Sequence, residues 1–404
     1  MPYRLAETSS AAVAVLLIGT TAALAADASD DRLTFRAGCG AGDRIVIAAV
    51  GDMLFHNSLQ RQALVPSSNY QRFWPSLRPV LEGADITYGN LEGTMAEGVS
   101  PSGQPVKDPG RRWDGRVYGA GVLVLNYNFH PSLAGDLKVS GFDIVSTANN
   151  HAADRGALGI DRTIEALDKA AVKYSGTRAR GYAEDRPWHE TTEAGGMTVA
   201  WISCTYSTNG NPDRADQVLH CYKDRQEIMT EIKWLAADPN IDAVILTPHW
   251  GVEQRSTPSR TDRDYAREAI ESGAAAVVGA HPHVLQGWEK IKASDGREGV
   301  VIYSTGNFIS NQVSDDQRTG IIALLELTRP SGGKAELSAA GFIPTWVTRG
   351  NHHVDEMKID MRRGARAYSA PLRRLPVGNH VTADKFRDLP RDCPVTAAAD
   401  AAHK

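Results

Sequence analysis

Metal-capable side chains stand at the ends of five apolar runs in this sequence. In one of them, "DIVSTANNHAADRG" at residues 143–156, Asn150 and His151 directly follow a segment typical of a buried strand. Amide and imidazole groups are costly to bury unless a partner satisfies them. The other four runs also end in carboxylate, amide or imidazole side chains, and these are Asp52, His56, Asn90, Glu92, His249, His281 and His283. Hard and borderline divalent cations accept such ligands, so the set predicts a metal site.

Each of these residues also has a purely structural explanation. A single histidine after a strand is more often a hydrogen-bonded structural residue, and the Gly51–Asp52 pair is first of all a turn signal. The coincidence favours a metal site, because five of the twelve histidines follow strand-like runs. For His56 alone the two explanations are balanced. We expect one or two divalent ions, Mn, Fe or Zn, at this site.

Short β-branched runs alternate with amphipathic segments from Arg44 onward, which is typical of βαβ units. The strands expected to carry the site residues are 44–52, 84–92, 142–151, 241–251 and 274–283. In open α/β sheets ligands bind at the carboxyl ends of the strands, so these side chains should converge. Between them, the segment 161–174 predicts a helix whose buried face carries Ile164, Leu167, Ala171 and Tyr174.

Composition and charge limit the class of protein. The chain has 404 residues, 42% hydrophobic and 23% charged, which is enough for one large α/β domain or two medium ones. The formal net charge of -4 gives no general attraction to nucleic acid, and we expect no nucleic-acid partner. The sequence contains neither the G-x-S-x-G elbow of a serine hydrolase nor a G-x-x-x-x-G-K-[ST] phosphate-binding loop.

The first 25 residues have the layout of a secretory signal peptide. Arg4 precedes an apolar stretch from about Ala11 to Leu24, and the small residues that follow allow cleavage after Ala25. An uncleaved membrane anchor is the alternative, but the apolar run is short for a spanning helix. We therefore expect a secreted or periplasmic protein.

The four cysteines of an exported chain would lie in an oxidising compartment. Their spacing suggests that Cys204 pairs with Cys221 and that Cys39 pairs with Cys393, although sequence alone does not establish the pairing. No two cysteines have the C-x-x-C spacing typical of a zinc site.

Six motifs, in order along the chain, resemble the CapA family of bacterial capsule and poly-γ-glutamate synthesis proteins. They are "AVGDML", "ITYGNLEGT", "FDIVSTANNHAADRGALGIDRTIEALDKA", "TPHWGVE", "GAHPHVLQG" and "VIYSTGNFISNQ". The family is similar in fold to the calcineurin-like metallophosphoesterases. The resemblance therefore implies an α/β fold, a two-sheet β sandwich flanked by helices in α-β-β-α layers. The implied layout is a signal peptide at 1–25, an N-terminal extension at 26–43, a CapA-like domain at 44–347 and an irregular C-terminal segment at 348–404.

The resemblance also implies a role for each matching residue. His151 stands where the catalytic histidine is expected, and Glu92 stands where a carboxylate bridges two metals. The other implied metal ligands are Asp52, Asn150, His249, His281 and His283. The chain departs from the phosphoesterase pattern in having Leu54 in place of the first histidine, with His56 two positions later, and in having Glu92 in place of an aspartate. The longer side chain of Glu92 changes the expected spacing between two metals, so the number of ions stays open at one or two.

Two hypotheses about function follow from the resemblance. The first is an exported metal-dependent hydrolase that cleaves a phosphoester or the amide of poly-γ-glutamate, with His151 protonating the leaving group. The second is a non-catalytic component of capsule biosynthesis or export that holds an anionic polymer among envelope-located capsule machinery. The residues expected to bind substrate are Asn90, Arg111 and Arg112. In the second hypothesis Arg111, Arg112 and Arg116, from a basic Pro/Gly-rich loop at 101–116, would help to hold the polymer. A solvated surface is the alternative explanation for that loop.

Overall fold

The computed structural model describes residues 31–35, 40–120, 125–182, 187–359 and 369–391. From Arg32 onward these residues belong to one compact unit, Arg32–Lys404. The predicted signal peptide and the predicted Cys39–Cys393 pair lie outside the described residues. The other predicted disulfide, between Cys204 and Cys221, is present, and its two Cα atoms are 5.0 Å apart. None of the helices in the described part of the chain has the length and apolar character that a membrane span requires.

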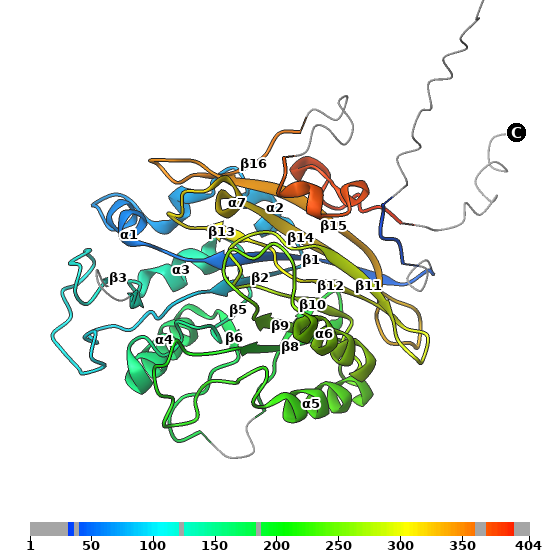
Figure 1. Ribbon diagram of the computed structural model, residues 1–404, viewed down its shortest axis with the longest axis horizontal. Helices are drawn as coiled ribbons and strands as arrows, with labels where there is room; N and C mark the ends of the chain where they lie inside the picture. The colour runs from blue at the N-terminus through cyan, green and yellow to red at the C-terminus, as the bar shows by residue number, and fades with distance from the viewer. Residues whose placement is uncertain (1–30, 36–39, 121–124, 183–186, 360–368, 392–404) are drawn as a thin grey trace, which may run out of the picture. The chain divides into compact units, whose positions relative to one another are not determined.

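The first sheet joins a parallel half to an antiparallel half at its central strand, β1 (Figure 1). The parallel half consists of β1 (Asp43–Met53), β2 (Ile86–Leu91), β5 (Ile144–Ser146) and β6 (Lys173–Ser175). The antiparallel half continues from β1 through β14 (Thr319–Arg329), β15 (Glu336–Val347) and β16 (Val354–Glu356). A short strand, β13 (Asn307–Ile309), pairs in parallel with the end of β1. Because both faces of this sheet are covered, β1 is buried from Ile45 to Met53.

The second sheet has six strands and is parallel in its centre. In spatial order they are β11 (Trp288–Lys292), β12 (Glu298–Ile302), β10 (Ala276–Val278), β9 (Ala243–His249), β8 (Met197–Thr205) and β7 (Glu190–Ala194). The two edge strands, β11 and β7, run antiparallel to their neighbours. A separate two-stranded ribbon pairs β3 (Gly119–Ala120) with β4 (Tyr127–Asn128).

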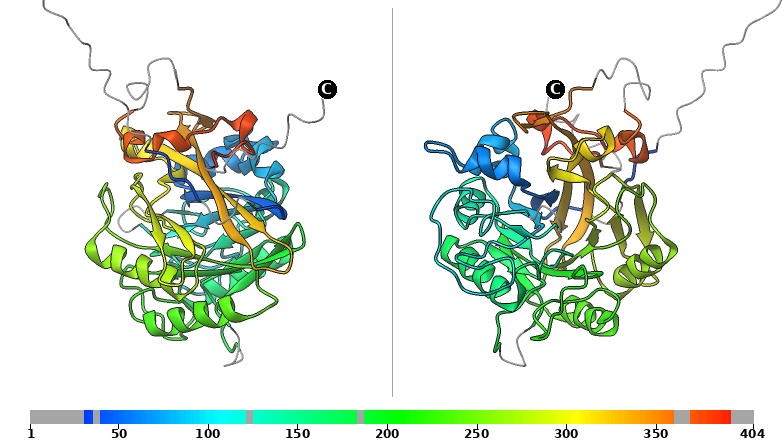
Figure 2. Two further views of the ribbon diagram at one scale, coloured as in Figure 1. Left: turned by 90° about the vertical axis from the view of Figure 1, so that its right-hand side faces the viewer. Right: turned by 60° about the vertical axis from the view of Figure 1, so that its left-hand side comes forward.

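The two sheets face each other across an apolar core, and helices cover their outer faces (Figure 2). Between the sheets, Tyr88 of β2 stacks on Trp201 of β8 with ring centroids 5.2 Å apart. The outer face of the first sheet packs against α1 (Asn57–Ala63), α2 (Arg78–Gly83), α3 (Ser132–Val139) and α4 (Gly156–Ala170). The second sheet packs against α5 (Arg225–Ala237) and α6 (Arg260–Ser272). The predicted α-β-β-α sandwich is therefore confirmed.

One predicted helix ends earlier than expected. Helix α4 stops one residue before Ala171, which adopts a left-handed conformation with a φ angle of 55°. Tyr174, predicted on the buried face of the helix, lies instead in strand β6. The prediction was therefore wrong for Ala171 and Tyr174, whereas Ile164 and Leu167 are buried on α4 as expected. A short apolar spacing fits a strand as well as it fits a helical face, so periodicity alone did not separate the two.

The segment after β15 contains more regular structure than its sequence suggests. It adds β16 to the first sheet, and its described residues include short 3-10 helices at Leu372–Arg374, Val377–Asn379 and Ala383–Lys385. The side chain of Asn379 donates hydrogen bonds to the carbonyl oxygens of Leu33 and Ala340, each at 2.8 Å. Asn379 thereby ties the residues that precede β1 to β15.

Candidate metal centre

Strands of both sheets bring the predicted metal ligands together. Asp52 and Asn90 lie within β1 and β2, one step earlier than the strand ends where they were expected, and are direct neighbours in the parallel register. A Cβ atom at Gly51 would lie 1.9 Å from the carbonyl oxygen of Gly306, so only glycine permits this approach of β1 to the segment before β13. The backbone N–H of Asp52 donates to that oxygen at 3.1 Å. His249 is the last residue of β9 in the second sheet.

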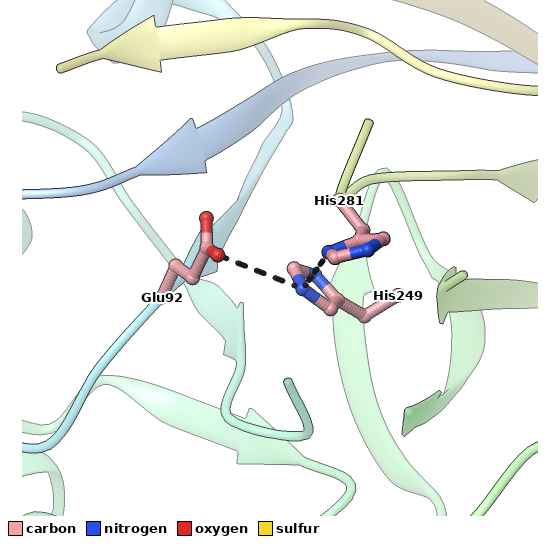
Figure 3. A group of neighbouring side chains, drawn as sticks. All are labelled: Glu92, His249 and His281. Atoms are coloured by element: carbon pink, nitrogen blue, oxygen red, sulfur yellow. Dashed lines mark hydrogen bonds and ion pairs between the residues drawn. The ribbon is translucent and has the colours of Figure 1, made fainter. Parts of the chain in front are cut away.

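Glu92, His249 and His281 form the first group of ligand atoms, all within 4.8 Å of one another (Figure 3). Nε2 of His249 lies 3.7 Å from Oε1 of Glu92 and 3.1 Å from Nδ1 of His281. The amide oxygen of Asn150 also lies 2.9 Å from Nε2 of His249. Four side chains from distant parts of the sequence therefore point at one small volume.

Asp52, Glu92 and His283 form a second group with the same spacing. Nδ1 of His283 lies 3.0 Å from Oδ2 of Asp52, and Nε2 of His283 lies 3.7 Å from Oε1 of Glu92. The side-chain oxygen of Asn307 lies 3.0 Å from the same Nδ1. Glu92 belongs to both groups, which is the position that a bridging carboxylate would occupy. We call Asp52, Glu92, Asn150, His249, His281 and His283 the ligand cluster.

The unsatisfied atoms of this region are hydrogen-bond acceptors. Both carboxylate oxygens of Glu92 are buried without a hydrogen-bond partner among the described residues, and so is the side-chain oxygen of Asn90. The Asn90 amide nitrogen is used, because it donates to Oδ1 of Asp52 at 2.8 Å. Buried acceptors without donors are costly, and a cation satisfies them directly. The residues present therefore fit a divalent metal, although they do not identify which one.

Burial and charge shift the pKa values of the cluster in opposite directions. Burial raises the pKa of Glu92 well above its usual range, and the neighbouring Asp52 adds to the effect. Burial lowers the pKa of His249 far below its ordinary value and, together with His283, lowers the pKa of His281 to about 3. Burial also disfavours charge on His283, but Glu92 and Asp52 outweigh it and raise its pKa to about 10. The two carboxylates thus favour positive charge at the centre of the cluster.

The backbone that carries the paired histidines is in an uncommon conformation. His281 and His283 have φ angles of 100° and 58°, which for non-glycine residues cost of order 1–3 kcal/mol each. The backbone N–H of His281 faces the carboxylate of Asp52, 3.3 Å from both oxygens. This turn aims both imidazoles at the carboxylates, which is the kind of strain found at functional sites.

His151 follows Asn150 on the turn after β5. Its Nδ1 donates to Oδ2 of Asp154 at 2.8 Å, and the same oxygen accepts the backbone N–H of Tyr127 at 2.6 Å. The side-chain oxygen of Asn149 accepts the backbone N–H of His151 at 3.1 Å. Because Nδ1 is committed to Asp154, Nε2 is the nitrogen left to hold or give a proton.

Comparison with known proteins identifies the family. A family model described as bacterial capsule synthesis protein PGA_cap matches residues 46–312. The chain belongs to this family. It is similar to the capsule biosynthesis protein CapA of Bacillus anthracis, with 29% identity over 184 residues that cover 44% of this chain and 42% of the relative. It is also similar to the PGA biosynthesis protein CapA of Bacillus subtilis (strain 168), with 28% identity over 205 residues, 50% of this chain and 51% of the relative.

This PGA_cap protein thus spans about half the length of those curated relatives. Among solved structures it is similar to the NAD nucleotidase NadN of Haemophilus influenzae, with a TM-score of 0.44 and 11% identity over 86% of this chain and 60% of that one. A putative 5′-nucleotidase from Staphylococcus aureus gives a TM-score of 0.42 and 13% identity, over 74% of this chain and 54% of that one. The fold class rests on the layers described above, and the predicted CapA family is confirmed by the family match.

His56 of this PGA_cap protein belongs to neither ligand group. Its Nδ1 lies 3.1 Å from the carbonyl oxygen of Leu54 and 3.2 Å from the backbone nitrogen of Asn311, and its ring stands edge-on to that of Tyr127 with centroids 5.4 Å apart. Burial lowers the pKa of His56 to about 4, so the ring is neutral near pH 7. We call His56, Tyr127, His151 and Asp154 the flanking group, because they lie next to the ligand cluster.

The structure does not bring Arg111 and Arg112 to the ligand cluster. The guanidinium of Arg111 donates to the carbonyl oxygens of Ala63 and Ser68, and so holds the loop 101–116 to the end of α1. Arg111 also lines a cavity with His130 on the outer side of α3 and α4. Arg112 is exposed. Binding of substrate by these arginines stays a prediction.

Sequence reasoning missed four residues that border the site. They are Tyr127, Asp154, Tyr206 and Asn307. Asp154 lies three positions after His151, in the motif that suggested the site, and Asn307 ends the "YSTGN" stretch, so both had a signal in the sequence. The ring of Tyr206, on the loop after β8, lies 4.5 Å from that of His281. Neither Tyr127 nor Tyr206 lies in one of the six motifs, so nothing in the sequence pointed to them.

Proposed function

We propose that this PGA_cap protein is an exported hydrolase that uses one or two divalent metal ions, Mn, Fe or Zn. Its substrate would be a phosphoester or the amide of an anionic capsule polymer such as poly-γ-glutamate. The observation that carries the proposal is the position of Glu92, whose buried carboxylate has no hydrogen-bond partner among the described residues and belongs to both ligand groups. The family and the capsule-related names of the relatives support a role in capsule polymer metabolism.

The proposed layout is the one expected from the sequence. A signal peptide at 1–25 would direct export, the domain at 44–347 would hold the site, and the segment 348–404 would complete the chain. Mass spectrometry of the protein from the periplasm or the medium should find a mature chain that starts at Ala26. Intact Met1 on a cytosolic protein would contradict export.

The roles of the residues follow from their contacts. Divalent ions held by the ligand cluster would supply Lewis acidity for the scissile group and lower the pKa of an attacking water. As the bond between the scissile phosphorus or carbon and its leaving group breaks, Nε2 of His151 gives a proton to the leaving oxygen or nitrogen. Asp154 orients the imidazole by accepting the Nδ1 proton at 2.8 Å, and it stabilises the charged ring. Asn90 orients Asp52.

The test compares His151→Ala with a matched control. His189→Ala removes a histidine that is also bonded to a carboxylate at 2.8 Å, from Nδ1 to Oε1 of Glu231, at the start of β7. Each protein is loaded with Mn²⁺ and assayed with bis(p-nitrophenyl) phosphate and with poly-γ-glutamate. We expect turnover of at least one substrate by the wild type and by His189→Ala, and a fall of about 10²–10⁴-fold for His151→Ala.

Two outcomes would contradict the proposal. Metal-loaded wild type that turns over neither substrate, yet binds poly-γ-glutamate, would favour a non-catalytic polymer-holding component of capsule biosynthesis. Equal turnover by the wild type and His151→Ala would remove the proposed role of His151.

A further inference from the structure

Tyr127 has a buried hydroxyl group without a partner. The residue is 1% exposed, and its hydroxyl has no hydrogen-bond partner among the residues that the structure describes. The backbone of Tyr127 is fixed on both sides: its N–H donates to Asp154 at 2.6 Å, and its carbonyl oxygen accepts the hydroxyl of Thr94 at 2.8 Å. An unpaired buried hydroxyl is unfavourable, so its position calls for an explanation.

The phenol ring stands edge-on to both imidazoles of the flanking group. The ring centroids of Tyr127 and His151 are 4.6 Å apart at 85°, and those of Tyr127 and His56 are 5.4 Å apart at 82°. Burial raises the pKa of the Tyr127 hydroxyl above its ordinary value, and Glu92 and Asp154 raise it further, so the group keeps its proton. The hydroxyl of Tyr127 is therefore a hydrogen-bond donor beside the ligand cluster. Within the cluster, the Glu92 carboxylate has acceptor oxygens without a hydrogen-bond partner among the described residues.

His56 lies on the same side of the site, and its ring stands edge-on to that of Tyr127. Nδ1 of His56 lies 3.1 Å from the carbonyl oxygen of Leu54 and 3.2 Å from the backbone nitrogen of Asn311, so these contacts fit either tautomer of the ring. The hydroxyl of Tyr127, unpartnered among the described residues, is suited to donate to an oxygen of a phosphoryl or carboxyl group. The ligand cluster is suited to cations, and the side of the site that carries Tyr127 is suited to anionic oxygens.

We propose that Tyr127 is a substrate-contacting residue, whose hydroxyl donates a hydrogen bond to an anionic oxygen of the group that is cleaved. This inference rests on the proposed function, because it concerns the same site. It adds a residue from β4, which lies outside every motif that pointed to the site. Tyr127 neither makes nor breaks a covalent bond in this role, since the phenol keeps its proton throughout.

A second buried tyrosine provides the control. Tyr70 is fully buried, and its hydroxyl lies next to the backbone of His130, away from the ligand cluster. Its ring packs edge-on against Phe55 at 5.0 Å, in the apolar core beneath the first sheet. Tyr70→Phe and Tyr127→Phe thus remove the same atom from equally buried positions, one in the core and one beside the site.

The experiment measures metal content, phosphate binding and turnover on the full mature chain loaded with Mn²⁺. The affinity for inorganic phosphate, measured by calorimetry, should fall about tenfold or more in Tyr127→Phe, as expected for loss of a hydrogen bond to a charged group. Turnover of bis(p-nitrophenyl) phosphate should fall about 10–10²-fold in kcat/KM. The metal content should match the wild type, and Tyr70→Phe should match it in all three measurements.

Phosphate affinity within twofold of the wild type in a metal-loaded Tyr127→Phe would overturn the inference. Failure of the wild type to bind phosphate at all would overturn it as well. Phosphate binding without turnover by the wild type would remove the proposed hydrolysis and leave the affinities to decide on Tyr127. Should Tyr127→Phe fold poorly, 3-fluorotyrosine placed at position 127 alone gives a ¹⁹F signal. That signal should move when phosphate is added, and a signal that does not move would refute the contact.

Discussion

The ligand cluster and the flanking group lie next to each other but are built from different kinds of structure. The cluster residues lie in strands or on the turns directly after them, and they come from both sheets. Tyr127 belongs to a two-stranded ribbon, and His56 directly precedes α1. The buried atoms that lack a hydrogen-bond partner among the described residues differ too. In Glu92 they are acceptor oxygens, and in Tyr127 the atom is a hydroxyl, which can donate. One side of the site is therefore suited to a cation and the other to the oxygens of an anion.

The strongest test of this division removes the paired histidines of the cluster. The double variant His281→Ala, His283→Ala should lose most of the one or two metal ions that we expect in the wild type, because each ligand group then lacks an imidazole. Elemental analysis of the purified mature protein measures this directly. The variant Tyr127→Phe is the control and should keep its metal.

Metal-free wild type that added Mn, Fe or Zn does not restore would contradict the cluster as a metal site. A double variant with wild-type metal content would show that the ion lies elsewhere. If elemental analysis finds a single ion per chain, the bridging role of Glu92 is the first to be questioned, because its place in both ligand groups is the reason to expect two ions.

The next test removes the proton-handling pair and leaves the cluster intact. Asp154→Asn keeps the shape of the side chain but removes the charge that orients His151, so kcat should fall by about 10–10²-fold, less than in His151→Ala. Metal content should stay at the wild-type level in both variants. Loss of metal in Asp154→Asn would mean that the flanking group and the cluster are not separable.

The sequence predicted one of these two regions much better than the other. The convergence of predicted ligands such as Asp52 and His249 could be foreseen, because parallel strands deliver their carboxyl ends to a common edge. His56 was placed among the ligands because its residue type fits, but the loop after β1 turns it towards Tyr127 instead. Loop geometry depends on tertiary contacts that no local pattern records, and this is why Tyr127 escaped notice.

The fold shows the same contrast between topology and local detail. The sandwich and its helices were predictable from alternating apolar runs and from the family resemblance. The end of α4 was not, because Ala171 continues the helical apolar pattern and only its left-handed backbone, with a φ angle of 55°, shows the break. Propensity and periodicity locate elements well and their boundaries poorly.

Removing the disulfide should have a smaller effect, and its loop contacts both the ligand cluster and the flanking group. Cys204 and Cys221 are 17 positions apart and close a loop whose Tyr206 touches His281 and whose Asn211 donates to Asp154 at 3.3 Å. Cys204→Ser with Cys221→Ser should lower the free energy of unfolding by about 3 kcal/mol in the chain-entropy model. Turnover should fall only a few-fold, because the loop supports the site without forming it.

Urea unfolding of the oxidised wild type and the double serine variant measures this difference. Non-reducing peptide mapping should recover Cys204 linked to Cys221, and alkylation before unfolding should label neither. Four freely alkylated cysteines in protein from an oxidising compartment would refute the bond in solution. Equal unfolding free energies would show that the loop is held by its backbone contacts alone.

The smallest effect concerns Arg155, which follows Asp154 in the flanking region. Its side chain is 1% exposed, yet Nε and Nη1 have no hydrogen-bond partner within the described part of the chain, and Nη2 reaches two carbonyl oxygens only at 3.5 Å. Burial lowers the pKa of this guanidinium to about 10, which reflects the cost of holding a charge there. Replacing such a group with an apolar side chain of similar length is often neutral or stabilising.

We therefore expect Arg155→Met to change the free energy of unfolding by about 1 kcal/mol or less, or to increase it, with metal content and turnover unchanged. Arg178→Met is the matched control, because Arg178 is also buried but its guanidinium lies 3.5 Å from the ring centroid of Trp188. That variant should be destabilised by the loss of the cation–π contact.

Phosphate binding by Arg155→Met also tests how far the side of the site that fits an anion extends. If Arg155→Met weakened phosphate binding as Tyr127→Phe is expected to do, the side that fits an anion would extend from Tyr127 to Arg155. If it left binding unchanged, the donors on that side would be limited to the flanking group, and the charge of Arg155 would serve neither stability nor the site.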